Sequence, residues 1–323
     1  MLDSTTLLGF VQQLRAVFEE KEDVTIDFSD LVYAFPIGIL IFGRNVRRFA
    51  SLRRARNFET IVSGHNKADR AVIGYLNHVG FFSFILLAGH PELGAAKGSG
   101  RYIPIRRVAR PEQFVRGSSA ESYAEAVKEA EGLAGLLVGG VPETWEAYQA
   151  FVYCFKEILR NVFEHSNAGA AFVVGQRWQN GSVEVAVMDE GRGIRASLAE
   201  SFPLVSDDEA VRHAVLPGVS RTTKSRQNLH DNSGFGLFVL SEMGRCYGEF
   251  TLGSNTAMLT IARDKPLEMQ ETYHRGTYVG LKMTQFPHNF SSLLDDIIES
   301  GERDAAIAGM RAKASASSRD IPF

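Results

Sequence analysis

The chain has 323 residues, a formal net charge of -3 and 45% hydrophobic residues. Its length allows about two domains, each able to bury a core, and its charge lacks the basic excess of nucleic-acid-binding proteins. The most apolar run, residues 79–89, falls short of the roughly 20 residues that span a bilayer, and Cys154 and Cys246 form no C-x-x-C pair. We therefore expect a soluble cytoplasmic protein that binds neither nucleic acid nor a membrane.

The first part of the chain alternates segments of helical and strand character. Apolar residues recur at helical spacing in one set of segments and alternate with polar residues in the other. The predicted helices lie at residues 3–20, 39–52 and 68–80, and the predicted strands at residues 24–28 and 58–62. This alternation is typical of a small α/β domain, which we place at residues 1–110.

A connecting region leads to the second half of the chain. A strand is predicted over residues 102–108 and an amphipathic helix over residues 119–137, and we assign residues 111–142 to the connection. The glycine-rich loop before this strand lacks the G-x-x-x-x-G-K-[ST] spacing of a P-loop. A Gly-Gly-Val-Pro stretch ends the helix and marks the start of the next domain, residues 143–290.

The second domain begins with a long amphipathic helix that starts near Trp145. Its predicted strands lie at residues 171–178, 182–188, 249–261 and 276–283. The first two strands are joined across Asn180-Gly181, a sequence that favours a tight hairpin turn. The pattern therefore predicts a sheet that begins with a hairpin and closes with two later strands.

Two segments of the second half lack clear periodicity. Residues 195–233 are polar and charged, and a loop of that length inside a compact domain is usually functional. We expect it to be a lid that a triphosphate orders. Residues 291–323 are expected to form a C-terminal helix and a disordered tail after Gly301, because the tail is rich in alanine and serine.

Polar residues that could carry chemistry occur first in the long helix and at the end of a strand. Glu157 and Asn161 are four residues apart, so they share one helix face. Asp189 directly follows the alternating strand 182–188. Each feature alone has a simpler interpretation, because a Glu/Asn pair is often a solvated helix edge and an aspartate often caps a turn.

Glycines accompany these polar residues at two places. Gly191 and Gly193 follow Asp189, and Gly234 and Gly236 precede a segment of helical character. Glycines let a backbone pass close to a ligand, and the backbone N–H groups at a helix start can bind phosphate. A pair of glycines alone is more often an ordinary turn.

Taken in order, and followed by Gly276-Thr277, these signatures resemble the GHKL superfamily of ATP-binding domains. That superfamily includes histidine kinases, the serine kinases that act as anti-sigma factors, gyrase, Hsp90 and MutL, and the serine kinases are the closest in type. The resemblance covers residues 143–284. It implies a Bergerat-type α/β sandwich whose mixed sheet is covered by helices on one face, with ATP or ADP as the ligand and Mg²⁺ as the cofactor.

The resemblance also implies a role for each signature. Asp189 would accept a hydrogen bond from the adenine amino group, with Gly191 and Gly193 beside the base and Thr277 supporting both through water. Asn161 would bind Mg²⁺, and Glu157 would act as the general base. Gly234 and Gly236 would bind phosphate.

Three further polar residues lie near these signatures. Lys224 or Arg221 would add positive charge when the loop closes, although both could equally face solvent. His165 ends the long helix, and we interpret it as a structural helix-end residue and not as a phosphoacceptor.

The N-terminal stretch from Val24 to Leu40 resembles STAS domains, the fold of anti-sigma-factor antagonists. Such an antagonist carries a phosphorylatable serine just before the loop glycine, whereas Ile37 holds that place here. An aliphatic side chain cannot accept phosphate, so we expect the domain to dock a partner and not to be phosphorylated.

The predicted helix after Pro36 carries the arginines that we expect to form the docking surface. These are Arg44, Arg47, Arg48, Arg53 and Arg54. A basic surface of this kind would bind an acidic partner or the acidic helix at residues 121–131. The alternative is an ordinary solvated helix.

The sequence therefore predicts an ATP- and Mg²⁺-binding regulator with ATPase or serine-kinase-like activity, which binds a protein partner through its N-terminal domain. One alternative is an ATP-gated clamp that forms a homodimer, in the manner of gyrase, MutL or Hsp90. The other is a regulator that only binds nucleotide.

Overall fold

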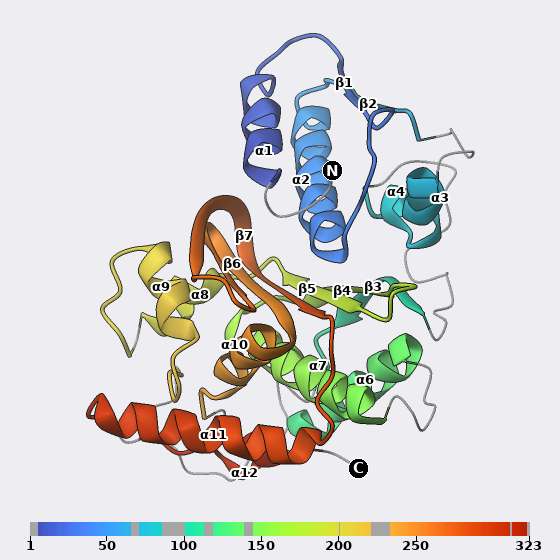
Figure 1. The fold of residues 1–323 in the computed structure, drawn as a ribbon. Coiled ribbons are helices and arrows are strands. Elements are labelled where there is room, and N and C mark those ends of the chain that lie inside the picture. Colours follow the sequence, from blue (N-terminus) through green and yellow to red (C-terminus); the bar gives the residue numbers. More distant parts are fainter. Residues whose placement is uncertain are drawn as a thin grey trace.

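Figure 1 shows the computed structural model of the chain. It describes residues 6–65, 71–85, 101–112, 119–138, 145–199, 201–220, 233–310 and 312–321. Within these ranges the protein is a mixed α/β structure that contains a five-stranded sheet and a two-stranded sheet. The predicted α/β class is therefore confirmed. No helix in the described ranges is both long and apolar enough to cross a membrane.

The five-stranded sheet has the order β3-β4-β5-β7-β6. Its strands are β3 (Tyr102–Ala109), β4 (Ala170–Arg177), β5 (Val183–Asp189), β6 (Gly248–Ala262) and β7 (Glu268–Met283). All four strand pairings are antiparallel, so the expectation of a mixed sheet is wrong. The predicted hairpin joins β4 and β5, and Gly181 adopts the positive φ that its turn needs.

The strand β3 belongs to this larger sheet because it pairs with β4. The sequence analysis had placed it in an N-terminal domain that ends at residue 110. Sequence patterning shows that a segment is a strand, but a strand at a sheet edge carries no local signal of its partner.

Four helices cover one face of the five-stranded sheet, and Figure 1 shows them below it. They are α6 (Ser119–Val138), α7 (Trp145–His165), α10 (Gly236–Tyr247) and α11 (Phe290–Ile307). Helix α7 buries Phe151, Phe155 and Leu159 in the same core as Val185 and Leu281 of the sheet. These apolar residues recur at helical spacing, so burial of this face fixes the orientation of α7.

An N-terminal layer covers the opposite face of the sheet (Figure 1). Its elements are α1 (Leu7–Ala16), β1 (Val24–Asp27), α2 (Pro36–Arg54), β2 (Thr60–Ser63), α3 (Ala71–His78) and α4 (Phe81–Phe84). The strands β1 and β2 are parallel, and α2 connects them. This layer shares one hydrophobic core with Met188 and Tyr278 of the sheet, so the expectation that helices cover only one face is wrong.

Ile37 is one of the residues that join the two parts of the molecule. Its Cδ1 lies 2.6 Å from the position that a Cβ on Gly280 of β7 would occupy. Gly280 therefore leaves room for α2 to lie directly on the sheet. Ile37 thus packs against β7.

Two segments that were predicted to be irregular contain helices. Residues 193–198 and 207–214 form α8 (Gly193–Leu198) and α9 (Asp207–Ala214). Ser206 caps α9 by accepting a hydrogen bond from Glu209 N at 3.0 Å, and the Ser-x-x-Glu spacing is a recognised helix-start signal. Residues 221–232 of the predicted lid lie outside the described residues.

The C-terminal region is folded over most of its length. Helix α11 extends to Ile307, and residues 312–321 contain the short helix α12 (Ala316–Arg319). Ser317 and Ser318 are buried there. The expected disorder after Gly301 is therefore not found over these residues, because tertiary contacts order a segment whose composition alone gives no core.

The predicted basic docking surface on α2 is wrong for two of its five arginines. Arg53 is 0% exposed, and Arg44 is also buried. Arg53 donates hydrogen bonds to the backbone carbonyl oxygens of Val17, Phe18, Glu20, Glu22 and Glu59. It therefore ties the end of α2 to the segment between α1 and β1.

We predict that Arg53→Ala destabilises the protein by about 3 kcal/mol, because it leaves several buried carbonyl groups without a donor. The exposed neighbour Arg54 provides the matched control, and Arg54→Ala should change the free energy of unfolding by less than about 0.5 kcal/mol. Urea denaturation followed by circular dichroism measures both variants. Equal stability of the two variants would contradict the role given to Arg53.

Candidate functional site

A cavity of about 90 Å³ lies between α7, the end of β5, α8, the start of α10 and β7. It is lined by six of the residues selected from the sequence, Asn161, Asp189, Gly193, Gly234, Gly236 and Thr277. These residues come from three signatures and a closing strand that are far apart in the chain. The fold therefore brings the separate signatures to one place.

The remaining selected residues lie beside the cavity or outside the described part of the chain. Gly191 and Glu157 are adjacent to the cavity but are not among its lining residues. Lys224 and Arg221 fall within residues 221–232, which are outside the described residues. His165, which was interpreted as a helix-end residue, ends α7 and also lines the cavity.

Asp189 ends β5 at the cavity and is only 2% exposed. Its Oδ1 accepts a hydrogen bond from Gly191 N at 2.7 Å, and the backbone of Thr277 provides a second one. Burial nevertheless raises the pKa of Asp189 to about 7, because loss of hydration outweighs these two donors. The carboxyl group therefore changes its charge near neutral pH.

Two glycines allow backbone segments to pass close to each other around Asp189. Gly191 lies against the backbone of Ser166, and Gly276 lies against the backbone of Asp189. A Cβ on Gly191 would lie 2.2 Å from Ser166 O, and one on Gly276 would lie 2.3 Å from Asp189 O. Gly276 also has a φ of 114°, which side-chain-bearing residues rarely adopt. Neither position admits a larger residue without movement of the backbone.

Two buried polar residues of β6 and β7 hold this arrangement, and no local motif in the sequence pointed to them. Ser254 Oγ accepts from Ile194 N at 2.9 Å and donates to Gly276 O at 3.0 Å. His274 Nε2 lies 2.7 Å from Asp189 O, and burial lowers the pKa of His274 to about 4, so the neutral ring donates this hydrogen bond.

Glu190 connects the cavity to the N-terminal layer. Its carboxylate accepts from Arg44 Nε at 3.1 Å and from Arg47 Nη2 at 3.0 Å, both on α2. Burial raises the pKa of Glu190, but the two arginines outweigh that effect and hold the pKa below its ordinary value. The turn that follows Asp189 is therefore bound electrostatically to α2.

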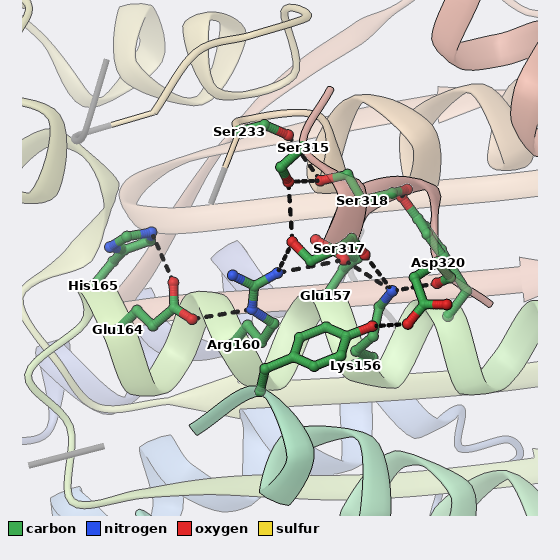
Figure 2. Close-up of polar contacts among 12 residues, drawn as sticks. Lys156, Glu157, Arg160, Glu164, His165, Ser233, Ser315, Ser317, Ser318 and Asp320 are labelled. Atoms are coloured by element: carbon green, nitrogen blue, oxygen red, sulfur yellow. Dashed lines mark hydrogen bonds and ion pairs between the residues drawn. The ribbon is translucent and has the colours of Figure 1, made fainter. Parts of the chain in front are cut away.

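Glu157 is separated from the cavity by the glycine turn. It is 1% exposed, and a Cβ on Gly236 would lie 2.4 Å from its Oε2. Lys156 Nζ lies 3.5 Å and Arg160 Nη1 lies 4.0 Å from Glu157 Oε1. Among the described residues, neither carboxylate oxygen of Glu157 accepts a hydrogen bond. Figure 2 shows this row of charged side chains on α7.

The glycine turn before α10 forms another wall of the cavity. Gly234 has a φ of 77°, and a Cβ there would lie 2.4 Å from Val219 O. Gly236 begins α10, so the free backbone N–H groups of this helix lie at the cavity. Such a helix start attracts anions through its unpaired donors and its dipole.

The described residues contain no group of three or more His, Cys, Asp or Glu side chains arranged to hold a metal ion. Asn161 is the selected metal ligand and lines the cavity. A Mg²⁺ ion at Asn161 would therefore take its other oxygen ligands from phosphates and water, as Mg²⁺ often does. The cavity volume of about 90 Å³ is smaller than the roughly 300–1,000 Å³ of typical small-molecule sites.

No family model matches this chain, and a search of curated proteins found no similar protein. The cavity combines three features: a buried carboxyl group with backbone donors, a glycine turn at a helix start, and an asparagine on the facing helix.

We predict that Gly276→Ala destabilises the protein by at least about 2 kcal/mol, because the new Cβ meets the backbone at a strained φ. Gly135 in α6 has open space around its Cα. Gly135→Ala should therefore stabilise the protein by up to about 1 kcal/mol. Thermal and urea unfolding of both variants test this contrast, and a tolerated Gly276→Ala would contradict the proposed close approach.

The raised pKa of Asp189 predicts a pH-dependent stability difference. The pKa of Asp189 is about 7 in the folded state, whereas the ordinary pKa of an aspartate is 3.8. Stability from the protonated form is therefore lost as the pH rises through about 7. Asp189→Asn removes this loss, so its stability relative to the parent should increase by about 2 kcal/mol between pH 5 and pH 8.

Urea unfolding at several pH values measures this difference. Asp296→Asn, which changes an exposed carboxyl group on α11, serves as the control for the effect of an Asp-to-Asn change at the surface. A constant difference for Asp189→Asn would show that Asp189 ionises normally in the folded protein.

Proposed function

We propose that this chain is an ATP- and Mg²⁺-binding regulator of the GHKL type, with ATPase or serine-kinase-like activity, joined to a STAS-like N-terminal layer. The observation that carries the proposal is the buried Asp189 carboxyl group at a cavity whose other walls include Asn161 and the glycine turn before α10. Gly234 and Gly236 line the same cavity, so backbone N–H groups at the start of α10 would be available there to phosphate oxygens.

Asp189 provides selectivity for adenine in this proposal. Its ionised carboxylate accepts a hydrogen bond from the exocyclic amino group of adenine. Guanine carries a carbonyl oxygen at the corresponding position, and two acceptors repel each other. Thr277 and Gly193 line the same cavity and would contact the base.

The other end of the site would hold the phosphates. Backbone N–H groups at the start of α10 would bind phosphate oxygens, and Lys224 or Arg221 would add positive charge from the lid. Bound Mg²⁺ supplies charge neutralisation to the phosphates, and the amide oxygen of Asn161 is the protein ligand that would hold it.

Glu157 is the proposed general base. It would accept the proton of an attacking water or serine hydroxyl while the γ-phosphoryl group passes to that oxygen and ADP leaves. Lys156 and Arg160 flank its carboxylate and hold negative charge there. The N-terminal layer would bind the protein partner, and the contacts of Arg44 and Arg47 with Glu190 would link that layer to the turn beside Asp189.

The burial of Glu157 favours one alternative, a regulator that binds nucleotide without turning it over. Glu157 does not line the cavity, and Gly236 stands between them. A measurement of binding and turnover on the same samples separates the two functions.

We predict that Asp189→Asn weakens ATP binding about 5- to 150-fold, the equivalent of about 1–3 kcal/mol for a mispaired buried polar contact. Glu157→Gln should bind ATP as the parent does and lose turnover. Isothermal titration calorimetry and phosphate release measure these effects, with the exposed Asp208→Asn as the control. Unchanged ATP affinity in Asp189→Asn would contradict the proposed pocket, and binding without turnover in the parent would favour the alternative.

A further inference from the structure

The C-terminal residues 312–321, which we call the strap, cross helix α7 at the position of Glu157. The strap contains α12 and lies beside Lys156, Glu157 and Arg160 in Figure 2. It also lies far from these residues in sequence. Its contacts fall into three groups, to the charged row of α7, to the glycine turn and to α11.

The strap takes up the hydrogen-bond donors that flank the proposed base. Lys156 Nζ donates to Ser317 O at 2.8 Å and to Asp320 O at 2.7 Å. Arg160 Nη1 donates to Ser317 Oγ at 3.2 Å. Lys156 and Arg160 are almost completely buried, so the strap both satisfies these cations and keeps them from other ligands.

The strap also contacts the glycine turn. Ser318 Oγ lies 2.7 Å from the Oγ of Ser233, the residue directly before Gly234. Tyr153 on α7 donates to Ser318 O at 3.1 Å, which fixes the backbone of the strap at that point. The strap therefore contacts both elements that would flank an acceptor hydroxyl group, the proposed base on α7 and the proposed phosphate-binding turn.

Glu157 is buried beside the closed strap. Its carboxylate is 1% exposed and pairs with Lys156 Nζ at 3.5 Å and Arg160 Nη1 at 4.0 Å. The strap accepts hydrogen bonds from the same two cations. Opening the strap would therefore free donors beside Glu157 and would expose its carboxylate to water or to an incoming hydroxyl group.

We propose that the strap is an autoinhibitory element that occupies the place of the phosphoryl acceptor. In the closed state it presents the serine hydroxyls of residues 317 and 318 beside Arg160 and Ser233, and it excludes water from Glu157. Turnover requires the strap to leave. This inference rests on the proposed function, because it assigns the regulation of the same site.

An ion pair at the edge of the molecule holds the strap to α11. Arg319 Nη2 lies 2.9 Å from Glu302 Oε1, which also accepts a hydrogen bond from Ala314 N at 2.9 Å. Arg319 Nη1 lies 3.6 Å from Asp295. None of these residues lines the cavity. The pair therefore offers a way to loosen the strap without changing the proposed catalytic or binding residues.

The test uses Glu302→Ala, Arg319→Ala and the double variant in the full chain. Arg56→Ala is the matched control, because Arg56 is an exposed arginine that pairs with Glu19 at 2.8 Å in the N-terminal layer, on the opposite face of the sheet from the strap (Figure 1). Hydrogen exchange of residues 312–321 reports opening, calorimetry reports ATP binding, and phosphate release reports turnover. In Glu302→Ala, Arg319→Ala and the double variant, we expect faster hydrogen exchange in the strap and about fivefold higher turnover, with ATP affinity unchanged.

The outcomes separate this inference from the proposed function. Absence of ATP binding in the parent and in every variant would contradict the proposed function itself. Autoinhibition would be overturned if the variants bind ATP and their strap exchanges faster, but their turnover equals that of the parent. The same holds if neither the parent nor any variant turns ATP over. Unchanged exchange in the double variant would show that the strap does not open and would overturn autoinhibition. ATP-derived phosphate on Ser315, Ser317 or Ser318 in the parent would also overturn it, because the strap would then be a substrate.

Discussion

Burial of the Asp189 carboxyl group at the end of β5 is the constraint on which the site depends. A carboxylate at this depth is costly, and its pKa of about 7 reflects that cost. Donors from the backbone of Gly191 and Thr277 lower the cost. Gly276 lets β7 approach β5 closely enough to bring the second donor. The turn after β5, the start of α8 and Gly276 of β7 are thus held together around one acidic group.

The same turn connects the two sides of the sheet. Asp189 faces the cavity, whereas its neighbour Glu190 binds Arg44 and Arg47 of the N-terminal layer. His274 donates a hydrogen bond to the backbone carbonyl oxygen of Asp189. Burial is the main cause of the lowered pKa of His274, and the positive charge of Arg44 lowers it further. A displacement of α2 would therefore change the electrostatic environment of the cavity.

Local patterns predicted the elements that their own residues specify. Helix α7, the hairpin at Gly181 and the glycine turn before α10 follow from helical periodicity, a turn sequence and the need for positive φ. Contacts between distant segments carried no such signal. The buried role of Arg53, the hydrogen bond of His274 and the folded strap depend on residues that lie far away in the sequence, and antiparallel pairing throughout the sheet depends on topology. Composition alone predicted a disordered strap, because a segment rich in serine and alanine has no core of its own. Contacts with α7 and α11 order it instead.

The central claim is that Asp189 makes this cavity a site for adenine. Its most direct test is calorimetric titration of the parent chain with Mg-ATP and with Mg-GTP, which share the same phosphate chain and differ in the group that faces Asp189. The account predicts that ATP binds at least about tenfold more tightly than GTP, because the guanine carbonyl leaves the buried carboxylate without a donor. Equal affinities for the two nucleotides, or binding of neither, would contradict it.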